Sequence, residues 1–224
     1  MFPLYCSKKT GNPCAWYRDE EVDGKLYRGV YYTQQRAVYS YQESNVTPSL
    51  QMDHSYPSKT IHCFAFEPIL WTVKNKTVGA AELVSARGLD SKEFNCTGLE
   101  NCYCTSTLHN WLNNDFVADA FGGELANSLG MLGYECEEDK VYLMRADYDR
   151  CFYESDAQTM IGTDYYRCLG GMGDYAISCF WLEDGNDCDC ERASVIYNGS
   201  RNTVAAQYVD CTSVAVVPKI VLKL

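Results

Sequence analysis

The chain has 224 residues and 13 cysteines, 13% of its residues are aromatic, and its formal net charge is −11. No cluster of Lys and Arg could neutralise a phosphate backbone, which argues against nucleic acid as a partner. No apolar run reaches the ~20 residues that a membrane-spanning helix needs, so the sequence predicts no membrane span.

The first part of the chain predicts strands and a loop within one domain that covers residues 1–224. Residues 1–26 are expected to form an N-terminal extension or a first strand. Residues 26–41 alternate aromatic and polar side chains, which predicts an antiparallel strand pair. Polar residues 42–60 predict a loop. A strand over 63–73 and an antiparallel return over 80–85 follow.

The middle of the chain predicts two helices. Thr105 or Ser106 can cap the first, in which Leu108, Trp111, Leu112 and Phe116 share one face. The second is expected over residues 124–132, between glycines. A strand over 140–144 and a loop with a brief helix over 147–175 follow. That loop contains Gly170-Gly171-Met172-Gly173, which lacks the lysine of a phosphate-binding loop and is expected to be a flexible turn.

The C-terminal third predicts four strands, over residues 177–182, 193–197, 204–209 and 214–222. Asn198-Gly199 predicts a tight turn between the second and third of them. Strands at both ends of the chain with helices between them predict the α+β class.

The cysteines do not form a regular framework. Their number is odd, so they cannot all pair within one chain. In the pairs Cys102/Cys104 and Cys188/Cys190, one residue separates the two cysteines, which is too close for easy mutual bridging. We therefore predict few or no disulfides, although secretion would favour them. The protein is expected at the cell surface or secreted if a leader was removed, and in the cytoplasm if Met1 is native.

The acidic stretch 184–191, DGNDCDCE, allows several kinds of site. Its oxygens could hold calcium, but the ligand order of an EF-hand is missing, so we expect no cofactor and keep calcium as an alternative. The C-x-C spacings are not the usual zinc pattern, and His109 lies among expected core residues. The neighbouring carboxylates should raise the thiol pKa of Cys188 and Cys190, which argues against them as nucleophiles.

An ordered series of segments resembles a bacterial family of uncharacterised domains found mainly in Firmicutes. Members usually carry Trp-Leu-Arg-Ser-Pro where this chain has residues 181–185, and they end in a segment like Val216-Val217-Pro218. The segments are YRGVYYTQQR (27–36), FEPILWTV (66–73), LVSARGLDSKEFN (83–95), LHNWLNNDFVADAF (108–121), DKVYLM (139–144), TDYYRCLG (163–170), FWLEDG (180–185) and VAVVPKIVLKL (214–224).

The resemblance implies a C-type-lectin-like fold of the formylglycine-generating-enzyme type, with antiparallel sheets and two flanking helices. The family is also similar to target proteins of diversity-generating retroelements, whose C-terminal strands and loops form a variable ligand-binding face. On this basis we expect a binding protein for a protein or glycan ligand, with no catalysis. The alternative is a cysteine-dependent oxidoreductase of the formylglycine-generating type.

The expected core supports the expected contact face. The core residues are Trp71, Leu108, Trp111, Leu112, Phe116, Trp181 and Leu182. The contact face follows the variable position in the family and uses Tyr for area and Asn, Asp and Arg for adaptable hydrogen bonds. Its residues are Asp184, Asn186, Asp187, Asp189, Glu191, Arg192, Tyr197, Arg201, Asn202, Gln207, Tyr208 and Asp210, with Tyr197, Arg201 and Tyr208 expected beside the acidic loop.

Overall fold

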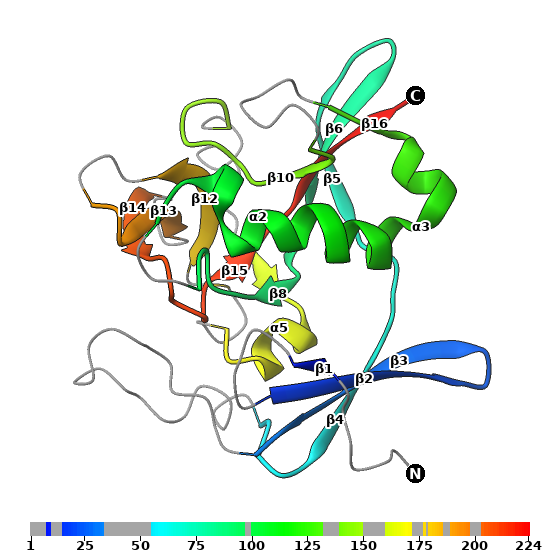
Figure 1. Ribbon diagram of the computed structural model, residues 1–224. Helices are drawn as coiled ribbons and strands as arrows, with labels where there is room; N and C mark the ends of the chain where they lie inside the picture. Colours follow the sequence, from blue (N-terminus) through cyan, green and yellow to red (C-terminus); the bar gives the residue numbers. More distant parts are fainter. Residues whose placement is uncertain are drawn as a thin grey trace.

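The protein is a mixed α+β structure with mostly antiparallel sheets (Figure 1), which confirms the predicted class. A computed structural model describes residues 8–9, 15–33, 55–96, 100–131, 139–149, 160–171, 177, 179–185, 189–197 and 203–224. Within these ranges, no helix has the length and apolar character needed to cross a membrane.

The N-terminal sheet has the strand order β1-β2-β3-β4. It contains β1 (Lys8–Lys9), β2 (Ala15–Val22), β3 (Lys25–Tyr32) and β4 (Ile61–Ala65). A tight turn at Asp23-Gly24 joins β2 to β3, and both turn residues have positive φ, 52° and 75°. Both edges of β3 are occupied by β2 and β4, and residues 34–41, the second half of the predicted strand pair, lie outside the described residues.

A second sheet forms around the C-terminal strand. Its order is β10-β16-β6-β5, and β9 also pairs with β16. The predicted hairpin is confirmed, because β5 (Trp71–Lys76) pairs with β6 (Ala80–Ser85). The other members are β9 (Leu129–Gly130), β10 (Val141–Tyr142) and β16 (Lys219–Lys223).

Two predicted strands are each divided at a proline. The expected strand 63–73 ends with β4 at Ala65 and resumes with β5 at Trp71, and Pro68 lies between them. The expected strand 214–222 is divided at Pro218 into β15 (Ala215–Val216) and β16. Proline has no N–H to donate to a strand ladder, which explains both interruptions.

The third sheet carries the predicted contact face. Its order is β14-β13-β12-β15-β8, with only the β12–β15 pair parallel. The strands are β8 (Asp90–Ser91), β12 (Cys179–Gly185), β13 (Arg192–Tyr197), β14 (Thr203–Tyr208) and β15. A small parallel pair joins β7 (Arg87–Gly88) to β11 (Ile161–Gly162). Tyr197 pairs with Thr203, and Asn198-Gly199, where the sequence predicts a tight turn, lies outside the described residues.

The helical part differs from the prediction of two separate helices. One continuous run of 21 residues comprises α2 (Thr107–Trp111), a π-helical turn η3 (Leu112–Phe116) and α3 (Val117–Asn127), with a kink at Gly122. A short 3₁₀ turn, η2 (Tyr103–Thr105), precedes it, and α5 (Asp164–Cys168) lies elsewhere. Ser106 caps α2 as predicted, because its Oγ accepts a hydrogen bond from the His109 backbone N–H at 3.0 Å.

The predicted helix face is buried, with one exception. Leu108, Leu112 and Phe116 are all in the core, where Trp181 is fully buried. Trp111 is half-buried: its ring packs on Phe116 with centroids 5.4 Å apart, and the Lys92 ammonium lies 4.4 Å from its centroid. Trp111 therefore lies at the edge of the buried face and not at its centre.

Around α5, glycines allow close packing instead of the expected flexibility. Gly170 and Gly171 are buried. A Cβ atom on Gly171 would lie 2.1 Å from the Tyr166 ring, and one on Gly162 would lie 2.2 Å from the same ring. Tyr166 is therefore enclosed by two positions that only glycine can occupy without displacing the ring.

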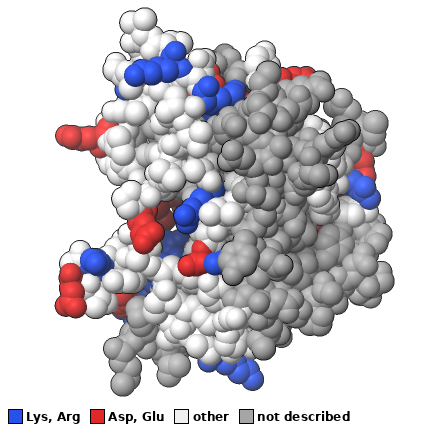
Figure 2. Space-filling view, turned by 180° about the vertical axis from the view of Figure 1, so that it is seen from behind, with Lys and Arg blue, Asp and Glu red and all other residues white. Residues whose placement is uncertain are grey.

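Arg28 on β3 connects the N-terminal sheet to the body. Its guanidinium donates to both carboxylate oxygens of Asp19, at 2.7 and 2.8 Å, and lies 3.5 Å from the Asp119 carboxylate on α3. The rings of Tyr17, Phe66 and Tyr165 surround the same cation at 4.2 to 5.7 Å. On the side hidden in Figure 1, basic and acidic side chains gather around a hollow in the surface (Figure 2).

Candidate functional site

A cation–aromatic cluster marks one end of the β13–β14 hairpin. Arg192 and Tyr208 are paired across the two strands. The guanidinium donates to the Tyr208 hydroxyl at 2.7 Å and also stacks over that ring, 4.3 Å from its centroid. The Arg192 Nε atom lies 3.3 Å from the Asp189 carboxylate, and both side chains are 38% exposed. The cluster is therefore ordered and reaches solvent.

Six of the predicted contact residues meet at this end of the hairpin. The Val209 N–H donates to the Glu191 carbonyl at 2.9 Å, and the Asp189 carboxylate accepts from the Glu191 N–H at 3.0 Å. These bonds hold the start of β13 beside the end of β14. The six residues are Asp189, Glu191, Arg192, Gln207, Tyr208 and Asp210.

Tyr197 is not part of this group. It lies five positions along β13 from Arg192, and side chains alternate between the two faces of a strand. Tyr197 therefore lies on the opposite face and at the far end from Arg192 and Tyr208, so the prediction that it lies beside the acidic loop is wrong. The remaining predicted contact residues are outside the described residues: Asn186, Asp187, Arg201 and Asn202.

The Asp184 side chain anchors the start of the acidic loop to the backbone at Ala146. Its carboxylate accepts from the Ala146 N–H at 2.7 Å, and the carboxylate of the preceding Glu183 accepts from the Leu143 N–H at 3.2 Å. Two consecutive acidic residues at the end of β12 therefore bind the backbone of residues 143–146. The structure gives Asp184 an anchoring position instead of the predicted contact position.

Glu183 has an altered acidity. The pKa of its carboxyl is raised to about 7, mainly by burial, and nearby Asp184 acts in the same direction. The positive charges of Lys219 and Arg145 and the Leu143 N–H oppose this change. Desolvation has the larger effect, because a charged carboxylate loses more solvation in a buried position than these partners restore.

Asn101 supports the same loop from the other side, and sequence reasoning did not identify it. Its side-chain amide donates to the carbonyl oxygens of Asp189 and Arg192, at 3.1 and 3.0 Å. A Cβ atom on Gly185 would lie 3.0 Å from the Asn101 carbonyl oxygen, so the two segments are in contact. Asparagine commonly bonds backbone groups in irregular segments, but this pairing spans about 90 residues and leaves no local pattern.

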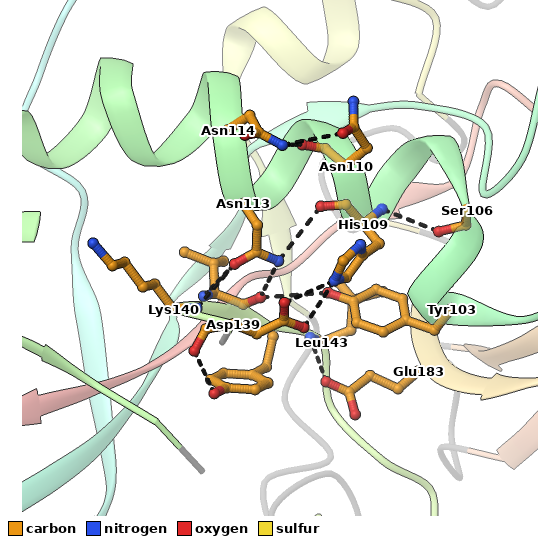
Figure 3. A network of polar contacts seen from close by, with 12 residues as sticks. Tyr103, Ser106, His109, Asn110, Asn113, Asn114, Asp139, Lys140, Leu143 and Glu183 are labelled. Atoms are coloured by element: carbon orange, nitrogen blue, oxygen red, sulfur yellow. Dashed lines mark hydrogen bonds and ion pairs between the residues drawn. The ribbon is translucent and has the colours of Figure 1, made fainter. Parts of the chain in front are cut away.

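A polar network joins α2 and η3 to residues 139–143, the segment to which the Glu183 carboxylate is hydrogen-bonded (Figure 3). The His109 Nε2 atom lies 2.8 and 2.9 Å from the two carboxylate oxygens of Asp139. The Asn113 side chain accepts from the Lys140 and Val141 N–H groups and donates to the Val141 carbonyl at 3.0 Å. These contacts fix residues 139–141 against the helix.

Tyr103 completes the network from the buried side. Its ring lies edge-on to His109, with centroids 5.0 Å apart. Burial, together with the nearby Glu183 and Asp139 carboxylates, holds the pKa of Tyr103 well above its usual value. The contacts of His109 and Asn113 with residues 139–141, and of Glu183 with Leu143, join separate parts of the fold, so we interpret the network as a brace for residues 139–143.

No protein-family model matches the chain, and no curated protein or solved structure matches it. The family resemblance of the sequence segments therefore stays a prediction. Among the residues that the structure describes, no group of three or more His, Cys, Asp or Glu side chains could hold a metal ion.

The cysteines are in two different environments. Cys104 forms a disulfide, whereas Cys102 and Cys190 carry free, exposed thiols. Burial raises the pKa of the Cys168 and Cys179 thiols, and the neighbouring Cys211 raises that of Cys179 further. A catalytic cysteine needs a lowered pKa, so these two buried thiols do not suit the nucleophilic role that an oxidoreductase would require.

Proposed function

We propose that the protein binds a ligand through the end of the β13–β14 hairpin. One observation carries the proposal: Asp189 and the Arg192–Tyr208 pair, at the ends of β13 and β14, form a half-buried cluster that reaches solvent and is held in place by neighbouring contacts. Arginine and tyrosine are the residue types that most often dominate binding energy in interfaces. Their position at the surface supports a contact role.

The anchoring of the loop favours binding. Glu183 and Asp184 bind the backbone of residues 143–146, and Asn101 binds the carbonyls of Asp189 and Arg192. A surface that is already ordered loses less conformational entropy when a ligand binds, which raises its affinity. The brace of Figure 3 extends this support to the helix.

The charges around the cluster suggest the chemistry of the ligand. The Asp189 carboxylate lies 3.3 Å from Arg192, Glu191 and Asp210 are close to this cluster in the sequence, and the whole chain has a net charge of −11. An acidic surface favours a basic partner and increases its association rate. We therefore propose a polypeptide ligand with Lys or Arg side chains, and a glycan is the alternative.

We further propose that the scaffold is of the C-type lectin type and that the C-terminal surface varies between relatives. The mixed α+β architecture and the mostly antiparallel sheets support the first part. The resemblance to target proteins of diversity-generating retroelements supports the second. A reverse-transcriptase gene with an adenine-templated repeat near the gene for this chain would support it further, and its absence would count against it.

A random-peptide display library, with a glycan array in parallel, tests the binding proposal. Peptides selected by the wild-type protein should be rich in Lys and Arg and should lose binding to Arg192→Ala and Tyr208→Ala. Tyr197→Ala is the matched control, because it removes a 40% exposed tyrosine from the other face of the same hairpin. Selected peptides that depend on Tyr197 but not on Tyr208 would overturn the assignment. Binding only on the glycan array would reject the polypeptide ligand.

A further inference from the structure

Two exposed thiols lie on either side of the contact made by Asn101. Cys102 directly follows Asn101, and Cys190 directly follows Asp189, whose carbonyl oxygen accepts the Asn101 amide at 3.1 Å. Consecutive Cα atoms are ~3.8 Å apart, so each cysteine is one residue from the same hydrogen bond. Both thiols are free and exposed in the structure.

The local backbone presents both cysteines at the surface. The Arg192 N–H donates to the Asp189 carbonyl at 3.1 Å, which closes a four-residue turn with Cys190 at its second position. Cys102 has an extended backbone (φ −74°, ψ 121°) just before η2. The contact between Gly185 and Asn101 keeps the two segments together.

The thiols of Cys102 and Cys190 are accessible to reagents in solution, unlike those of the cysteines in the core. Cys104, two residues from Cys102, already forms a disulfide, so the segment can carry one. Exchange between thiols and disulfides needs an accessible sulfur. Cys102 and Cys190 meet this condition, whereas Cys168 and Cys179 are fully buried.

We propose that Cys102 and Cys190 are a redox-active thiol pair that closes to a reversible disulfide, with a small-molecule disulfide such as glutathione disulfide as the oxidant. The Cys102 thiolate attacks the small disulfide, forms a mixed disulfide and releases one small thiolate. The Cys190 thiolate then attacks the Cys102 sulfur and releases the second. The protein loses two electrons and two protons, and one small disulfide becomes two thiols.

Closure links the segment that holds Asn101 to the turn that begins at Asp189. A covalent bond then joins the two segments beside Arg192, where in the reduced protein the hydrogen bonds of Asn101 join them. The bond formed is independent of any ligand, so its test does not depend on the proposed binding function.

The test uses the full chain, equilibrated with glutathione and glutathione disulfide and then alkylated. Cleavage after Tyr103 separates Cys102 from Cys104, and cleavage before Asp189 separates Cys188 from Cys190, so mass spectrometry can assign each bond. The wild type should give a peptide that links Cys102 to Cys190, and reductant should remove it. In Cys190→Ser, the glutathione adduct at Cys102 should be at least ~10-fold more abundant than in the wild type, because intramolecular attack no longer removes it.

Cys63→Ser is the matched control, because Cys63 is an exposed free thiol on β4, in another sheet. This variant should form the Cys102–Cys190 bond to the wild-type extent. Separate glutathione adducts on Cys102 and Cys190 in the wild type, or a bond from either cysteine to a different one, would overturn the proposal. Melting temperatures of the variants, measured under reducing conditions, should equal that of the wild type. If a variant melts at a lower temperature, its result is set aside and the peptide map of the wild type decides the proposal.

Discussion

Glu183→Gln should change how stability depends on pH. The Glu183 carboxyl has a pKa of about 7 in the folded protein, against an ordinary value of 4.5, because it is buried. Between these two values the folded state binds more protons than the unfolded state. The free energy of unfolding therefore falls as the pH rises from 4.5 to about 7, and it stays at the lower level above that range.

The size of the effect follows from the two pKa values. A shift of about 2.5 units at ~1.4 kcal/mol per unit gives a loss of about 3 kcal/mol across the window. Glutamine cannot ionise, but its side-chain oxygen can still accept from the Leu143 N–H. The variant should therefore lose this part of the pH dependence and be more stable than the wild type above about pH 7.

Urea denaturation followed by tryptophan fluorescence at several pH values measures this difference. Glu124→Gln on α3 is the control, because Glu124 is exposed, and its stability curve should run parallel to that of the wild type. If the curves of Glu183→Gln and the wild type are also parallel from pH 4.5 to about 7, the buried carboxyl does not titrate in this window and the reasoning fails.

Three pairs of substitutions test the packing and the anchors by chemical denaturation. Trp181→Ala should lower the free energy of unfolding by ~3–5 kcal/mol because Trp181 is fully buried. Trp111→Ala should lower it by about 2 kcal/mol because Trp111 is half-buried. Equal losses would contradict the described burial. Gly171→Ala should cost ~1–3 kcal/mol by forcing a methyl group into the Tyr166 ring, whereas Gly79→Ala, with no atom within 4 Å of the new Cβ, should cost much less. Asn101→Ala should lower the free energy of unfolding by ~1–3 kcal/mol, because the carbonyls of Asp189 and Arg192 lose the hydrogen bonds from the Asn101 amide. Asn114→Ala, at an exposed position, is the reference, and a similar loss there would show that Asn101 is no anchor.

Local signals predicted local structure well. The hairpin of β5 and β6 and the Ser106 cap depend on a few neighbouring residues, and both are found as expected. The helix face required only periodicity, which succeeded for Leu108 and Leu112. It was only partly right for Trp111, which packs against the core but is half-buried, and periodicity did not predict the π-helical turn that follows it.

The candidate surface was predicted only in part, because it depends on register and on distant contacts. In the structure Arg192 pairs with Tyr208 and Tyr197 pairs with Thr203, and no local pattern in the sequence gives that register. The Asn101 and Glu183 anchors join segments far apart in the chain, and no local sequence pattern around either residue predicts its partner. Composition could suggest the surface, but only the fold shows what supports it.

The order of the strands in the second sheet has a consequence for the time course of folding. β6 pairs on one side with β5, its immediate predecessor, and on the other with β16, which is synthesised after most of the remaining chain. The N-terminal hairpin of β2 and β3 can form as soon as it is made, whereas the edge of β6 must wait for β16. During synthesis β6 therefore exposes an unpaired strand edge, which is the kind of surface that chaperones protect and that aggregates when left open.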